Sequence, residues 1–80
     1  MKGKIKKFII ENFLLGKGDL KDNQPLFEEG VIDSFGFVLL LSFLEKESNI
    51  HFDRSQITID NFNSLACIME SIKNARSNKS

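Results

Sequence analysis

The stretch LFEEGVIDSFG, residues 26–36, is where an irregular segment passes into a helix. Three of the five glycines and the only proline fall within residues 16–32, which predicts a loop there. Loops longer than about 12–15 residues in small domains are mostly functional or disordered. This loop carries apolar residues that we expect to anchor it to a hydrophobic core: Leu26, Phe27, Val31 and Ile32.

The loop is followed by an unusually apolar helix. Asp33 and Ser34 are both good N-cap residues, and helix-forming residues follow as far as Asn49. Eight of the ten residues 35–44 are apolar, whereas a half-buried helix needs about three or four in seven. We expect four of them to lie in the core: Val38, Leu40, Leu41 and Leu44.

The other apolar side chains of this helix, Phe43 among them, are candidates for a surface that binds a partner. We single out Phe35, Phe37 and Leu39, together with Val31 just before the helix, as partner-binding residues. The alternative is that the remaining helices and the long loop bury this helix on nearly all sides.

Two further helices are predicted from apolar residues at helical spacing. The first covers residues 4–15 and ends at a Gly-Lys-Gly break, and the last begins at Asn63 or Ser64. A short helical turn near residues 54–58 lies between the second helix and the last. No segment alternates between apolar and polar residues for long enough to predict a strand. The predicted fold is therefore all-α: a four-helix bundle with a long loop between helices 1 and 2 and a short third helix.

Length and composition favour a single domain over residues 1–80, with residues 77–80 as a frayed tail. The chain is 41% apolar and 28% charged, close to the average for soluble globular proteins, so disorder is not expected. A core of this size leaves little room for an enclosed catalytic pocket. We therefore expect a protein that is not an enzyme.

The single cysteine, Cys67, and the single histidine, His51, exclude an intramolecular disulfide and the usual Cys/His zinc site. No apolar run reaches the about 20 residues that a membrane span needs, and no secretion signal follows the basic start. We expect a monomeric, cytoplasmic protein without a metal ion or a membrane span. His51 should be an exposed connector residue, and Cys67 should be half-buried in the last helix.

The net charge of zero hides basic ends and an acidic middle. Residues 1–18 hold five lysines and one glutamate, and residues 61–80 hold three basic residues and one glutamate. Residues 19–60 hold nine acidic and three basic residues. A nucleic-acid-binding protein needs a basic surface at its reading element, so we expect no nucleic-acid partner. The early lysines are interpreted as the solvated face of the first helix.

Ser34 has two possible roles in the local sequence. It can cap the helix, or its hydroxyl can be exposed for covalent modification. The free N–H groups and the positive dipole end of a helix N-terminus suit an attached phosphate. No histidine lies near Ser34 in the sequence and no Gly-x-Ser-x-Gly motif surrounds it, so hydrolase chemistry has little support.

Residues 26–36 resemble the attachment motif of the acyl carrier protein family, which includes peptidyl and aminoacyl carrier domains. That motif is Asp-Ser followed by a large apolar residue, and a leucine pair or Leu-Phe, a glycine and two aliphatic residues precede it. The resemblance continues through Leu44-Glu45, the Ile50-x-Phe52 connector and Phe62-x-Ser64-Leu65, so it covers nearly the whole chain.

The resemblance implies that a phosphopantetheinyl transferase attaches 4′-phosphopantetheine from coenzyme A to Ser34, and that Asp33 orients the attachment site. An acyl or aminoacyl group would be carried as a thioester on the terminal thiol. The other implied partners are an acyl- or aminoacyl-activating ligase and a downstream acyltransferase or synthase. The chain would present the thioester and catalyse nothing itself.

Some residues differ from the pattern of the acyl carrier protein family, and these differences indicate which type of carrier the chain resembles most. Gly36 and Leu39 stand where fatty-acid-type carriers show acidic residues, and the motif is more similar to that of aminoacyl, peptidyl or polysaccharide-modifying carriers. Ser48 stands where the family often has phenylalanine, so we expect Ile50 and Phe52 to replace that core anchor. The alternative function is an unmodified helical adaptor that binds a protein through the apolar face of the second helix.

Overall fold

Helical segments account for all of the regular secondary structure in residues 1–77, the part of the chain that the computed structural model describes. They are α1 (Lys2–Phe13), α2 (Ser34–Ser48), a 3₁₀ turn η1 (Arg54–Gln56), α3 (Ile59–Phe62) and α4 (Leu65–Ser77). The predicted four-helix bundle, with a long loop after its first helix and a short third helix, is therefore confirmed.

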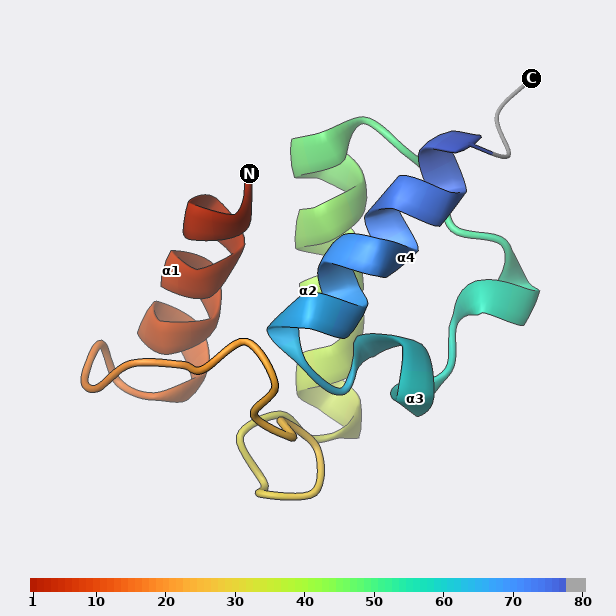
Figure 1. Cartoon of the computed structure of the whole chain (residues 1–80). Coiled ribbons are helices and arrows are strands. Elements are labelled where there is room, and N and C mark those ends of the chain that lie inside the picture. Colours follow the sequence, from red (N-terminus) through yellow and green to blue (C-terminus); the bar gives the residue numbers. More distant parts are fainter. Residues whose placement is uncertain (78–80) are drawn as a thin grey trace.

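Figure 1 shows how these elements are arranged. α1 runs down from the N-terminus, and the loop of residues 14–33 crosses the lower end of the bundle to reach the first turn of α2. α2 then runs upward behind α4, and α3 lies near the lower end. Ser34, the first residue of α2, therefore lies at the end of the bundle where the loop and the end of α1 meet.

The first helix begins and ends two residues earlier than predicted. Leu15 has a left-handed backbone (φ +57°), and the Gly16 N–H donates a hydrogen bond to the Ile10 carbonyl at 2.9 Å. This turn closes α1 before the Gly-Lys-Gly break that was expected to end it. The second helix ends as predicted, with Asn49 in the left-handed conformation.

The region between α2 and α4 differs more from the prediction. The turn expected near residues 54–58 is the 3₁₀ turn η1, and the short third helix of the bundle, α3, begins after it at Ile59. Thr58 caps α3, because its hydroxyl accepts a hydrogen bond from the Asn61 N–H at 3.2 Å. Ser77 belongs to α4 and not to a frayed tail, and residues 78–80 of that tail lie outside the described residues.

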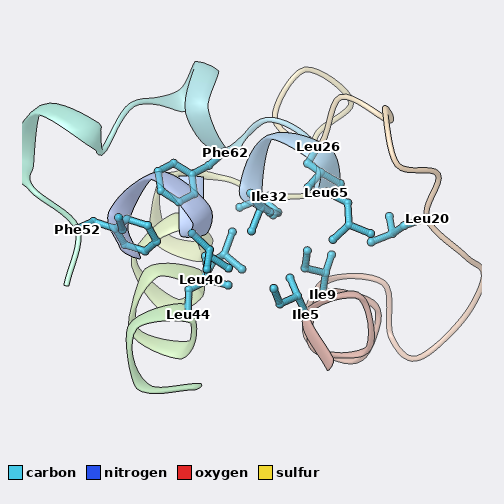
Figure 2. Packing of buried hydrophobic residues seen from close by; sticks show 13 residues of the cluster. Ile5, Ile9, Leu20, Leu26, Ile32, Leu40, Leu44, Phe52, Phe62 and Leu65 are labelled. Atoms are coloured by element: carbon cyan, nitrogen blue, oxygen red, sulfur yellow. The ribbon is translucent and has the colours of Figure 1, made fainter. Parts of the chain in front are cut away.

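The loop contributes to the hydrophobic core alongside the helices. Figure 2 shows Ile5 and Ile9 of α1 on one side of the core and Leu40 of α2 on the other, with Ile32 of the loop between the helices. Leu26 and Ile32 are buried as predicted, and Phe27 and Val31 are half-buried against the core. The buried core residues are Ile5, Ile9, Leu20, Leu26, Ile32, Leu40, Leu44, Phe52, Phe62, Leu65, Ile68, Ile72 and Ala75.

The connector after α2 supplies the aromatic anchor that Ser48 lacks. Phe52 is fully buried, with its ring centroid 5.2 Å from that of Phe62 in an edge-to-face arrangement. Ile50 is half-buried beside this cluster. The Ser48 hydroxyl donates a hydrogen bond to Met1 Sδ at 3.3 Å.

Only part of the apolar surface of α2 reaches the core. Leu40 and Leu44 are buried as predicted and Leu41 is half-buried against the core, but Val38 is exposed, so the placement of Val38 in the core was wrong. With 3.6 residues per turn, Val38 lies on nearly the opposite side of the helix from Leu40. No helix within residues 1–77 combines the length and the apolarity that crossing a membrane requires.

Lysines of α1 pair with acidic residues from other segments. Three such pairs are Lys2 with Asp22 at 2.6 Å, Lys4 with Glu47 at 2.9 Å and Lys6 with Asp19 at 2.8 Å. Because these pairs are largely exposed, each contributes little to stability. The hydrogen bond from Lys6 lowers the pKa of the Asp19 carboxyl below its ordinary value. The ionised Asp19 carboxylate therefore stabilises the folded state at neutral pH, and this stabilisation is lost as the pH falls through the pKa of Asp19 in the folded state.

Gly36 lies where α2 packs closely against α1. A Cβ at this position would lie 2.8 Å from Cε1 of Phe13, 3.2 Å from Oδ1 of Asp33 and 3.3 Å from Cγ2 of Ile32. We expect Gly36→Ala to lower the free energy of unfolding by about 1–3 kcal/mol in a denaturant titration, because the added methyl group overpacks this contact. Gly3→Ala is the control, since a Cβ on Gly3 meets no atom within 4 Å. Equal stability of the two variants would contradict the close contact.

Candidate functional site

The side chain of Asp33 caps α2. Its Oδ1 accepts a hydrogen bond from the Gly36 N–H at 2.7 Å, and its carbonyl accepts one from the Phe37 N–H at 2.8 Å. The backbone of Asp33 is extended (φ −102°, ψ −175°), as is usual for an N-cap. Of the two predicted caps, Asp33 therefore takes the role, and the interpretation of Ser34 as the cap is wrong.

Ser34 is consequently left with an exposed hydroxyl at the start of the helix. Within residues 1–77, no hydrogen bond engages its Oγ, and no acceptor is bound to the backbone N–H groups of Ser34 and Phe35. These N–H groups and the helix dipole place a partial positive charge beside the hydroxyl. The arrangement suits a serine that bears an anionic group.

Asn63, between α3 and α4, holds the segment that precedes Ser34. Its carbonyl accepts a hydrogen bond from the Leu26 N–H at 2.7 Å, and its Oδ1 accepts one from the Phe27 N–H at 2.9 Å. The Leu26 carbonyl in turn accepts from the N–H groups of Val31 at 2.9 Å and Ile32 at 3.1 Å. Hydrogen bonds thus connect the α3–α4 junction to the residue before Asp33, which fixes the entry to α2.

Exposed apolar side chains form a patch directly after Ser34. Phe35 is 74% exposed, Val38 61% and Leu39 45%, and the spacing i, i+3, i+4 places them on one face of α2. We call these three residues the apolar patch. Phe35 and Leu39 were predicted partner-binding residues, and Val38 joins them on the surface.

The other two predicted partner-binding residues are less accessible. Phe37 is half-buried, with its ring centroid 5.1 Å from that of Phe27 and 5.4 Å from that of Phe62. Val31 is half-buried against the core. The ring of Phe37 therefore packs the loop and α3 against α2. Phe43 is also half-buried, since its ring stacks on that of Phe8 at 4.1 Å.

The chain on either side of Ser34 carries few charges. No charged residue lies in α2 before Glu45. The charged residues that precede Ser34 most closely in the chain are Glu28, Glu29 and Asp33, all acidic and exposed. The first 11 residues of α2, which include the apolar patch, are therefore uncharged.

The other two reactive side chains, those of His51 and Cys67, make no hydrogen bond with Ser34 within residues 1–77. His51 is an exposed connector residue, as predicted, and its Nδ1 lies 3.1 Å from Oε2 of Glu45. The same oxygen accepts the Phe52 N–H at 2.9 Å, so this pair belongs to the far end of α2. Cys67 is half-buried in α4, as predicted. Within residues 1–77, Ser34 thus has no hydrogen-bonded base that could activate it.

Neither a scan against protein-family models nor a search of the curated proteins finds a match for this chain. The features that bear on its function are therefore those of the molecule itself. They are the exposed hydroxyl of Ser34, the separate cap on its helix and the apolar patch beside it.

Two residues that shape the site are not singled out by sequence reasoning. Asn63 was considered only as a cap for the last helix, a role that Ser64 takes by accepting the Cys67 N–H at 3.1 Å. Its contact with Phe27 joins residues 36 positions apart, which no local pattern reports. Gly36 did carry a signal, because a glycine inside a helix is costly unless close packing requires it.

Removing the cap should weaken the start of α2. We expect Asp33→Ala to lower the free energy of unfolding by about 1 kcal/mol, because the Gly36 N–H loses its acceptor. Asp33→Asn is the matched control, since an asparagine side chain caps about as well. Denaturant titration measures both variants, and an equal loss in each would mean that the negative charge matters and the hydrogen bond does not.

Removing the Asn63 side chain should loosen the loop before Ser34. Asn63→Ala leaves the Phe27 N–H without its partner in a half-buried position, at a cost of about 1–3 kcal/mol. We expect faster amide hydrogen exchange at Phe27 and Val31. Asn61→Ala is the control, because that side chain donates only to the exposed Gln56 carbonyl at 2.9 Å. If the amide hydrogens of Phe27 and Val31 exchange at the same rate in the two variants, Asn63 does not hold the loop in place.

Proposed function

We propose that this chain is a carrier protein whose Ser34 hydroxyl bears a 4′-phosphopantetheine group through a phosphodiester bond. The observation that carries the proposal is the division of roles at the start of α2. Asp33 caps the helix, so the Ser34 hydroxyl is exposed and free of hydrogen bonds within residues 1–77. The resemblance of residues 26–36 to the carrier attachment motif suggests which group is attached.

The residues around Ser34 fit a phosphodiester. The backbone N–H groups of Ser34 and Phe35 can donate to its oxygens, and the dipole of the 15-residue helix favours its charge. Asp33 brings a nearby negative charge, but its Oδ1 is engaged by the Gly36 N–H. The hydrogen bonds that Asn63 accepts from the loop backbone support a fixed position for the attached group.

When bound, the arm supplies a thiol on which an acyl or aminoacyl group is carried as a thioester. Ser34 contributes the oxygen that forms the new bond to phosphorus, while the bond from that phosphorus to the departing adenosine bisphosphate of coenzyme A breaks. The hydroxyl proton must pass to a base. Because no side chain within residues 1–77 is hydrogen-bonded to the Ser34 hydroxyl, and Oδ1 of the neighbouring Asp33 is engaged by the Gly36 N–H, we assign the role of base to the phosphopantetheinyl transferase.

The proposed partners all act on this end of the bundle. They are the transferase, an acyl- or aminoacyl-activating ligase, and a downstream acyltransferase or synthase. The uncharged first half of α2 supports recognition by apolar contact with little electrostatic steering. This favours the aminoacyl, peptidyl or polysaccharide-modifying subtype over the fatty-acid type, working in the cytoplasm where coenzyme A is available.

A second candidate function is an unmodified helical adaptor. The exposure of the apolar patch supports it as well as it supports a carrier, because either protein must dock on a partner. The adaptor gives no reason for an exposed serine directly after a separate cap. The carrier accounts for both features.

Intact-protein mass spectrometry tests the proposal after incubation with coenzyme A, Mg²⁺ and a broad-specificity phosphopantetheinyl transferase. We expect the wild type to gain the mass of one phosphopantetheine group and Ser34→Ala to gain none. Ser42→Ala is the matched control, because Ser42 is exposed on the same helix and its variant should load like the wild type. All three proteins should give the same circular dichroism spectrum.

The opposite outcome would favour the adaptor. If several transferases leave the wild type unmodified, the carrier proposal fails. The adaptor then predicts that Ser34→Ala keeps partner binding, whereas Leu39→Glu loses it without losing helical circular dichroism.

A further inference from the structure

α1 and α4 are in contact, and a groove runs along one side of that contact. Its volume is about 650 Å³, which lies in the range of about 300–1,000 Å³ that small-molecule sites occupy. We call it the α1–α4 groove and define it by six of the residues that line it: Lys2, Ala66, Met69, Ile72, Lys73 and Arg76.

The α1–α4 groove changes in character along α4. Ala66, Met69, Lys73 and Arg76 are spaced i, i+3, i+7 and i+10, so they lie on one face of that helix. Ala66, Met69 and the buried Ile72 give the groove an apolar lining, whereas Lys73 and Arg76 are exposed in the second half of α4. The groove therefore has an apolar part and a cationic end.

The two cations at this end are not neutralised by the protein. Within residues 1–77, neither Lys73 nor Arg76 forms an ion pair. Glu70 also lines the groove, but its carboxylate is paired with neither of them. Both cations are therefore available to an anion.

The third cation of the groove is already neutralised. Lys2 Nζ lies 2.6 Å from Oδ2 of Asp22, and the Asp22 carbonyl accepts a hydrogen bond from the Ala66 N–H at 3.0 Å. This ion pair is therefore held beside the first turn of α4, at the apolar part of the groove. The free positive charge is confined to the other end.

A second hollow, of about 320 Å³ between α1 and α2, shows the contrast. It also has two lysines, but Lys4 pairs with Glu47 at 2.9 Å and Lys7 pairs with Glu11 at 3.8 Å. Its charges are thus balanced within the protein. Only the α1–α4 groove, of these two, combines an apolar lining with unpaired positive charge.

We propose that the α1–α4 groove binds a fatty carboxylate, with the alkyl chain along Ala66 and Met69 and the carboxylate at Lys73 and Arg76. A guanidinium can donate two parallel hydrogen bonds to a carboxylate, and the apolar lining takes the chain out of water. At about 1.5 Å per helical residue, Ala66 and Arg76 are about 15 Å apart along α4. An extended chain advances about 1.2 Å per atom, so about 12 carbons span this distance.

This site is separate from Ser34. The cationic end lies at the C-terminal end of α4, at the upper end of the bundle in Figure 1, and Ser34 lies at the lower end. The proposed binding therefore needs no group attached to the serine, and it can be tested on the unmodified full chain.

Calorimetric titration with dodecanoate, below its micelle-forming concentration, tests the proposal. We expect the wild type to bind with a Kd of about 0.1 mM, as is reasonable for a ligand of this size in an open groove. Arg76→Gln should raise the Kd about fivefold, because the carboxylate loses its charged hydrogen bonds.

Lys46→Gln is the matched control for the charge. Lys46 is an exposed cation in the last turn of α2, as Arg76 is in the last turn of α4, so both variants lose a favourable interaction with a helix dipole. The two variants should therefore lose similar stability, but Lys46→Gln should bind dodecanoate like the wild type.

The apolar part of the groove is tested separately. Ala66→Phe fills it without a change of charge, and its helical circular dichroism should be kept because Ala66 is exposed. We expect this variant to raise the Kd for dodecanoate about tenfold. Octanoate should bind the wild type at least about tenfold more weakly than dodecanoate, since it buries four fewer methylene groups.

Three results would overturn the proposal. The first is no binding of dodecanoate by the wild type at about 1 mM ligand. The second is an equal Kd in Arg76→Gln and Lys46→Gln, or a Kd that Ala66→Phe leaves unchanged. The third is binding to phosphatidylglycerol vesicles without binding to dodecanoate, which would make this face a membrane contact. Ser34→Ala should bind dodecanoate like the wild type, so each result leaves the role of Ser34 untouched.

Discussion

The hydrogen bond from the Gly36 N–H to the Asp33 carboxylate determines where α2 begins, and the surroundings of Ser34 depend on it. An N-cap side chain satisfies a backbone donor that the helix itself leaves free. Because Asp33 does this, the next residue enters the helix with its hydroxyl directed to solvent and its own N–H group available. A serine in the capping position would have used its oxygen for the backbone instead. The chemistry proposed for Ser34 therefore follows from which of two adjacent residues caps the helix.

The loop before α2 gives that arrangement a fixed position. Leu20, Leu26 and Ile32 are buried. Asn63, which is distant in sequence, accepts hydrogen bonds from the backbone N–H groups of Leu26 and Phe27. These contacts offset the conformational entropy lost when so long a segment is ordered. At the same time, Gly36 lets the last turn of α1 approach the first turn of α2. The end of the bundle is thus built from three segments that are distant in sequence.

The same end concentrates features that are unfavourable in an isolated protein. The apolar patch is exposed to water, and Leu15 holds a backbone conformation that favours glycine. Exposed apolar patches of this size are typical of surfaces that bind a partner, and backbone strain is concentrated at functional sites. The α1 lysines pair with Asp19, Asp22 and Glu47, none of which belongs to the apolar patch.

Local patterns were enough for the all-α class, the long loop, the position of α2 and its end at Asn49, and the choice of Asp33-Ser34 as the helix start. These properties depend on neighbours within one or two turns, such as caps, glycines and apolar spacing. The sequence could not decide which of Asp33 and Ser34 caps the helix, that Val38 faces water while Phe37 packs on Phe62, or that Asn63 braces the loop. Each of these depends on contacts between residues that are distant in sequence. The exposure of Val38 also depends on how much of the apolar surface of α2 the other segments can cover. Only the packed tertiary structure determines that, because a small core has room for one face of so apolar a helix and the remainder must stay in solvent.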